Sequence, residues 1–317
     1  MENNGGEGCP RTRRCIGEGS KVDDPKLCEE PELIADCACT VGENPIWHPA
    51  KQQLLWTDIP AGHLYGYDPK LRRHEAFYKG RPVGGLTIQD DGALLLFKDR
   101  GMITCWRDGH EVTLIPEIPE ERELGFNDVI ADPSGRVFCG TYADGHLGRL
   151  YRLNTDGSLT KLLDGIGCSN GMAFTLDRTG FFYTDSSARA IYKFDYEQDD
   201  GSIRNRKIFY EVPEDDGLPD GCTVDSEGYL WFALWGGSRI VRLDPEGRVS
   251  ASFRIPAKQT TSLTFAGPDL RDIYVTSEGG EWRTDDDPLA GALFRMRCRI
   301  AGKPEYFSSI ILPAEIK

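Results

Sequence analysis

Apolar residues in this chain fall into short runs, continuous or alternating with polar positions, and each run ends near Gly, Asp, Asn or Pro. Runs of this length between turn-forming residues predict β-strands. Helical spacing of apolar positions is scarce after residue 39. The clearest runs are Leu54–Thr57, Ala93–Phe97, Phe181–Thr184 and Tyr229–Phe232. The pattern therefore predicts an all-β protein.

A turn motif recurs along the chain, and each copy carries a glycine just before an apolar run. These glycines stand at positions 92, 135, 180 and 228, so the intervals are 43, 45 and 48 residues. One further step back reaches His48–Leu54, and one step forward reaches Gly267–Ile273. Units of this length, built from short strands, are the signature of a β-propeller. Six units predict a six-bladed β-propeller.

A second marker recurs about twenty residues after the strand that follows each turn. It is a short segment in which apolar and polar positions alternate before another turn, as expected for the third strand of a four-stranded blade. A β-sandwich with accidental spacing would explain neither marker. The segments are Leu64–Asp68, Leu150–Asn154, Ile191–Asp195, Ile240–Asp244 and Leu293–Met296.

The first residues stand outside the repeat. Residues 1–30 are rich in Gly, Glu, Lys and Arg, which predicts a flexible extension, with a small folded cysteine motif as the alternative. Residues 31–317 are predicted to form the propeller. Half of the ten cysteines are spread through the later chain in apolar surroundings, and we expect them to be free thiols of the core. They are Cys105, Cys139, Cys168, Cys222 and Cys298.

Charge and hydropathy narrow the range of partners. A net charge of −14 over 317 residues makes nucleic acid an unfavourable partner, because its phosphates are also negative. No segment approaches the roughly 18 consecutive apolar residues of a membrane span. The N-terminus lacks the apolar core of a secretory signal, so we expect a cytoplasmic protein. Small molecules or other proteins remain as partners.

Polar residues recur at equivalent positions of four units. Glu43, Asn127, Asn170 and Asp220 each lie about ten residues before the turn glycine of their unit or its equivalent. Since a propeller brings equivalent positions together around its channel, we expect these four side chains at one channel end. Two carboxylates and two carboxamides supply the hard oxygen ligands that Ca²⁺, Mg²⁺ or Mn²⁺ prefer. The alternative for each residue is an ordinary turn role.

The segments around these residues resemble the family of senescence marker proteins and gluconolactonases, which also contains regucalcin. The likeness extends from about Pro31 to the last blade, and the segments are Gly42–Trp47, Phe126–Asp128, Ser169–Met172 and Pro219–Gly221. The resemblance implies a six-bladed propeller with one divalent ion in its channel. It implies that Glu43, Asn170 and Asp220 bind the ion. Asn127 would lie beside it, as a fourth ligand or in contact with substrate or water.

The same resemblance implies an enzyme that opens a sugar lactone to the sugar acid, as a monomer or homodimer. Asp220 or a neighbouring carboxylate would accept a proton, and Asn127 would stabilise the oxyanion. Calcium is the expected ion, with Mg²⁺, Mn²⁺, Zn²⁺ and Fe²⁺ as alternatives. Many members carry an Arg where this chain has Gly125, and an acidic substrate contact would fall near Asp144. The alternative function is a non-enzymatic propeller that binds calcium or a protein.

Overall fold

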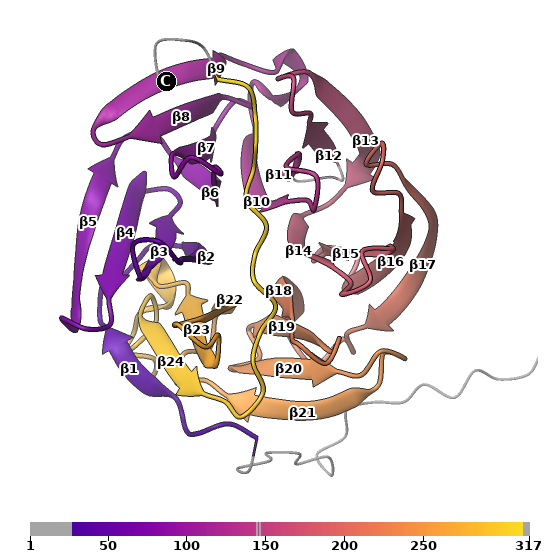
Figure 1. The fold of residues 1–317 in the computed structure, drawn as a ribbon. Helices are drawn as coiled ribbons and strands as arrows, with labels where there is room; N and C mark the ends of the chain where they lie inside the picture. The colour runs from indigo at the N-terminus through magenta and orange to yellow at the C-terminus, as the bar shows by residue number, and fades with distance from the viewer. Residues whose placement is uncertain (1–26, 144, 146, 313–317) are drawn as a thin grey trace, which may run out of the picture.

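Six four-stranded antiparallel sheets form a closed ring in the computed structural model, which describes residues 27–143, 145 and 147–312 (Figure 1). From the channel outwards, the first blade consists of β2 (Gly42–His48), β3 (Gln53–Asp58), β4 (His63–Asp68) and β5 (Arg73–Lys79). The second blade consists of β6 (Val83–Ile88), β7 (Leu94–Lys98), β8 (Ile103–Arg107) and β9 (His110–Ile115). The third blade consists of β10 (Gly125–Ala131), β11 (Val137–Tyr142), β12 (Gly148–Leu153) and β13 (Leu159–Ile166).

The other three blades follow in the same way around the ring. The fourth blade consists of β14 (Ser169–Phe174), β15 (Gly180–Asp185), β16 (Ala190–Tyr196) and β17 (Ile203–Glu211). The fifth blade consists of β18 (Leu218–Val224), β19 (Leu230–Trp235), β20 (Arg239–Leu243) and β21 (Val249–Arg254). The sixth blade consists of β22 (Thr260–Ala266), β23 (Asp272–Ser277), β24 (Leu293–Arg297) and β1 (Glu32–Ala35). The described residues include two short 3₁₀ helices, η1 (Pro119–Glu121) and η3 (Gly280–Trp282). The predicted six-bladed propeller is confirmed, and the second marker falls on the third strands.

The recurring turn has a local physical cause. In the third blade, Oδ1 of Asp132 accepts hydrogen bonds from the backbone N–H groups of Ser134 (2.8 Å) and Arg136 (2.9 Å). Asp225 makes the equivalent pair of bonds in the fifth blade. Gly135 has a φ of +83°, a conformation that costs side-chain-bearing residues energy. An aspartate followed by a glycine therefore fixes the hairpin between the inner two strands.

Aromatic side chains fill the space between neighbouring blades. Phe138 on β11 packs against Phe174 and Phe181 of the fourth blade, with ring centroids 5.5 and 4.9 Å away. All three rings are completely buried. Each blade therefore buries one face of its strands against the preceding blade and the other face against the next blade. Burial on both faces explains the nearly continuous apolar runs of these strands.

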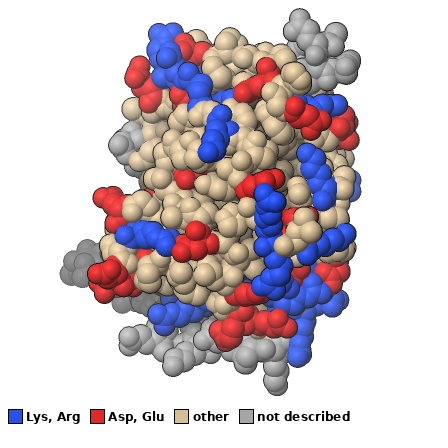
Figure 2. Space-filling model, turned by 90° about the vertical axis from the view of Figure 1, so that its left-hand side faces the viewer, with Lys and Arg blue, Asp and Glu red and all other residues tan. Residues whose placement is uncertain are grey.

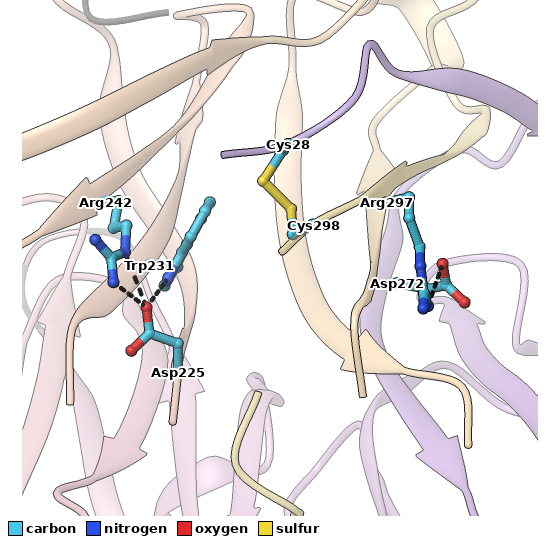
Figure 3. The surroundings of a disulfide bond; sticks show 7 residues. All are labelled: Cys28, Asp225, Trp231, Arg242, Asp272, Arg297 and Cys298. Carbon is cyan, nitrogen blue, oxygen red and sulfur yellow. Dashed lines mark hydrogen bonds and ion pairs between the residues drawn. A yellow bond between two sulfur atoms is a disulfide. The ribbon is translucent and has the colours of Figure 1, made fainter. Parts of the chain in front are cut away.

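The ring is closed by two ends of the chain. Strand β1 pairs with β24 and becomes the outermost strand of the sixth blade. Beside this pairing, Cys28 and Cys298 form a disulfide, and both residues are buried (Figure 3). The expectation that Cys298 is a free thiol is therefore wrong, because its partner lies in the segment that the sequence placed outside the propeller. Residues 1–26 of the predicted extension lie outside the described residues.

We expect loss of this disulfide to destabilise the propeller. The cross-link joins residues 270 positions apart, so it restricts the unfolded chain strongly. The double variant Cys28→Ser/Cys298→Ser should lose about 2–5 kcal/mol of unfolding free energy, measured by chemical denaturation. A reducing agent should destabilise the wild type and leave the double variant unchanged. A wild type that is insensitive to the reductant would contradict this role.

A buried charged cluster lies near the disulfide (Figure 3). Oδ2 of Asp225 accepts hydrogen bonds from Nε of Arg242 (2.9 Å) and Nε1 of Trp231 (2.8 Å). Asp225 is fully buried, so these donors provide the hydrogen bonds that its side-chain oxygen cannot obtain from bulk water. The cluster connects the turn between β18 and β19 to the third strand of the same blade.

The C-terminal segment crosses the ring at the end of the channel that carries the turns between the inner two strands of each blade (Figure 1, yellow). It begins near the fifth blade, where Ser226 N–H donates to Ala301 O (2.9 Å). It ends near the second and third blades, where Ser308 N–H donates to Ile88 O and Ser309 N–H donates to the carbonyl of Gly135. This segment crosses one channel end, and the cavity described below lies at the opposite, open end.

Acidic and basic side chains are interspersed on the face shown in Figure 2, which includes the outer part of the first blade. Exposed ion pairs such as Arg72–Glu32 and Arg73–Glu75 lie in this part of the surface. Within the described part of the chain, no helix is long and apolar enough to cross a membrane.

Candidate metal centre and active site

Each innermost strand is irregular near its start, at the open end of the channel. In β2 the register with β3 shifts between Glu43 and Ile46, and in β14 it shifts between Asn170 and Met172. The other four inner strands shift at equivalent places. A β-bulge redirects side chains that would otherwise follow the regular alternation. This shared irregularity explains why polar residues at the strand starts can face the channel.

The four residues predicted from the sequence line one cavity of about 590 Å³ at this end. They come from four blades, with Glu43 on the first, Asn127 on the third, Asn170 on the fourth and Asp220 on the fifth. In a ring of six blades, the first lies opposite the fourth. Glu43 and Asn170 therefore approach the channel axis from opposite sides, with Asp220 beside Asn170.

Two oxygen atoms in this cavity are buried without a hydrogen-bond partner: Oδ1 of Asn170 and Oδ1 of Asp220. The amide nitrogen of Asn170 donates to Oγ of Ser186 (3.1 Å), which in turn donates to the carbonyl of Pro219 (2.6 Å). These bonds fix the amide so that its oxygen is the unpaired atom. Buried polar atoms are nearly always paired, so two orphaned oxygens on neighbouring blades are suited to bind a cation or water.

Burial and mutual repulsion disfavour the charged forms of the carboxyl groups. Burial and the nearby Asp128 raise the pKa of Glu43 to about 8. Burial and the charge of Glu43 raise the pKa of Asp220 well above its usual range. A divalent cation between the two carboxylates would compensate both effects, because it stabilises their ionised forms.

The donor chemistry fits a hard cation. Carboxylate and carboxamide oxygens are ligands of Ca²⁺, Mg²⁺ and Mn²⁺. No group of three His, Cys, Asp or Glu side chains suited to a metal occurs in the described part of the chain. The two carboxylates could therefore hold an ion here only together with the amide oxygens.

Asn127 is held in a different way from Asn170. Its Nδ2 donates to the backbone carbonyl of Ser169 (2.9 Å), so the blade that carries Asn170 also orients Asn127. Ser169 itself is fully buried at the start of β14, which excludes it as an exposed nucleophile. Cys168, expected in the core, instead lines the cavity and is only half-buried.

The cavity contains a third carboxylate, Glu278, that sequence analysis did not single out. It follows β23, the second strand of the sixth blade, whereas the predicted residues lie on innermost strands. No repeat-equivalent position marked it. Trp235, at the end of β19, lines the same cavity and was missed for the same reason.

Sequence analysis also pointed to Asp144 as a substrate contact and to Gly125 as the position where an arginine is absent. Asp144 lies outside the described residues, although its neighbours Ala143 and Gly145 line the cavity. Gly125, where the resemblance implies an arginine in many members, begins β10 and pairs with Tyr142. No Lys or Arg occurs among the described residues that line the cavity. No basic side chain in that lining replaces the arginine.

Similarity to known proteins identifies the family to which this six-bladed propeller belongs. Residues 41–279 match the model of the SMP-30/Gluconolactonase/LRE-like region, and the chain belongs to this family. It is 43% identical to the pentonolactonase XacC of Haloferax volcanii over 88% of this chain and 98% of that protein. It is 31% identical to regucalcin of Oryctolagus cuniculus, over 87% of this chain and 97% of that one.

A solved structure of a luciferin-regenerating enzyme has the same architecture. Its TM-score is 0.81 with 26% identity, over 88% of this chain and 99% of that chain. The family resemblance predicted from the sequence is therefore confirmed.

Proposed function

We propose that this protein is a metal-dependent lactonase that hydrolyses a sugar lactone to the corresponding sugar acid. The observation that carries the proposal is the pair of orphaned oxygens on Asn170 and Asp220, which line the same cavity as Glu43. The 43% identity to a pentonolactonase supports the reaction, since the match extends over nearly the whole of both chains.

Glu43, Asn170 and Asp220 would hold the cation, with Ca²⁺ as the expected ion and Mg²⁺, Mn²⁺, Zn²⁺ and Fe²⁺ as alternatives. When bound, a divalent cation polarises the lactone carbonyl and favours ionisation of water. Asn127 would donate from its amide to the oxygen that becomes negative, or contribute a fourth ligand. Asp220 or a neighbouring carboxylate would take the proton from the attacking water.

The cavity supports a small polar substrate. Its volume of about 590 Å³ falls within the range of small-molecule sites. Its described lining carries carboxylates and amides without Lys or Arg, which suits a neutral polyol lactone better than a phosphorylated one. Asp144 remains a proposed substrate contact.

The test is hydrolysis of a panel of aldonolactones by the purified protein with each divalent ion, followed with a pH indicator. Because Gly125 provides no side chain to select among hydroxyl groups, we expect several aldonolactones to be hydrolysed within about a tenfold range of kcat/KM. Strong preference for one lactone would mean that another side chain provides selectivity. Calcium binding without hydrolysis of any lactone would instead support the non-enzymatic alternative.

Cytoplasmic location, a monomeric or homodimeric state and the absence of nucleic-acid and membrane partners stay predictions. The Cys28–Cys298 disulfide argues against a reducing compartment, because structural disulfides are rare in most cytosolic proteins.

A further inference from the structure

Glu278 lies on a blade that carries none of the proposed metal ligands. It belongs to the sixth blade, which lies opposite the third blade in the ring, and the third blade carries Asn127. Both residues line the same cavity. A lactone placed between them would have an amide donor on one side and a carboxylate on the other.

Two tryptophans hold the Glu278 carboxylate in place. Nε1 of Trp235 donates to Oε2 (2.6 Å), and Nε1 of Trp282 donates to Oε1 (3.2 Å). The indole rings meet edge to face with their centroids 5.6 Å apart. Each carboxylate oxygen therefore has one fixed donor and retains lone-pair capacity for a water molecule.

The other two carboxylates of the cavity are less suited to accept a proton. Glu43 and Asp220 are 4% and 6% exposed, and we have proposed them as metal ligands. A carboxylate that coordinates a cation has donated electron density and is a weaker base. Glu278 is partly exposed, and the exposed Trp282 and Glu281 follow it on a short helical turn towards solvent.

We propose that Glu278 is the general base of the lactonase, an assignment that rests on the proposed function. Its carboxylate takes a proton from water as the water oxygen bonds to the lactone carbonyl carbon. The carbonyl electron pair moves to oxygen, beside Asn127. When this pair returns, the ring C–O bond breaks and Glu278 gives its proton to the departing oxygen. The new carboxylic acid then loses its own proton to solvent.

The charges around Glu278 agree with this role. Burial raises its pKa, partly offset by the two indole N–H donors, and Glu281 on the same segment raises it further. Glu43 and Asp220 face it from the first and fifth blades, and the charge of Glu278 contributes to raising the pKa of each. Among the described residues of the cavity lining, no basic side chain opposes them. A base with a raised pKa accepts a proton more readily near neutral pH.

The experiment compares metal-loaded wild type with Glu278→Gln, which keeps the shape and an acceptor oxygen. We expect kcat to fall by about 10²–10⁴-fold. KM should stay within about threefold, and the metal content should not change. The low-pH limb of the kcat profile should disappear, since the group that loses its charge there is gone. Glu281→Gln, a matched change at the exposed neighbour, should retain wild-type kcat.

Trp282→Phe provides a second, independent measurement. It removes a hydrogen bond to the charged carboxylate, so it should raise the pKa of Glu278 and move the low-pH limb of kcat to higher pH. Trp235 emission should report the same transition without substrate. If Glu278→Gln keeps full kcat, or loses its metal together with its activity, the base assignment is overturned while the lactonase stands. A wild type that hydrolyses no lactone overturns both.

Discussion

Asp220→Ala should lose bound metal and lactonase activity together. The substitution removes a proposed ligand whose Oδ1 has no hydrogen-bond partner, and only Glu43 and the amides would remain to hold the ion. We expect metal affinity to fall on the order of a hundredfold or more, since even indirect contacts of a metal site cost ten- to a hundredfold. Metal analysis by mass spectrometry and lactone hydrolysis on the same preparation provide the measurement.

The matched control is Asp220→Asn, which keeps the shape and removes the charge. Without metal, this variant should melt no lower than the wild type, because it removes a buried carboxyl group that repels Glu43. A normal melting temperature would show that the loss of metal is local. Full activity in Asp220→Ala would be incompatible with the proposed site.

Asn127→Ala should separate metal binding from transition-state stabilisation. Glu43, Asn170 and Asp220 stay in place, so most of the metal should remain bound. Turnover should fall on the order of a hundredfold, the usual cost of one lost oxyanion donor, with little change in KM. Steady-state kinetics and metal content measured on the same variant test this.

Ser186→Ala is the informative comparison for Asn127→Ala. It removes the hydroxyl that orients the Asn170 amide, so it should act on metal affinity rather than on turnover at saturating metal. If Asn127→Ala is purified without metal, Asn127 is a fourth ligand and the oxyanion is stabilised by the ion.

The sequence predicted the repeat because its turns have a strict local chemistry. Asp132 and Asp225 accept backbone bonds at fixed offsets, and Gly135 and Gly228 adopt positive φ, so the same letters return in each unit. The fourth unit differs, since Arg178 rather than Gly180 adopts the positive φ. The repeat was still recognisable because the spacing and the apolar runs around it are conserved between units of this chain.

The candidate site was predictable as far as the repeat extends. Glu43, Asn127, Asn170 and Asp220 lie at equivalent places on inner strands, so their offset revealed a shared cavity. Glu278 comes from a loop of one blade, where position in the repeat carries no information. The Cys28–Cys298 disulfide was also beyond reach, because it joins the ends of the ring and depends on how the last blade is completed.

The C-terminal segment crosses the channel end opposite the cavity, so in the proposed lactonase the lactone and the product acid would share the open end. A sugar lactone is neutral and its hydrolysis product is an anion. With one divalent cation bound as proposed, ionised Glu43, Asp220 and Glu278 would leave the cavity with a net negative charge, which would repel the product but not the lactone. In the proposed reaction, ring opening would itself create the charge that favours release of the product.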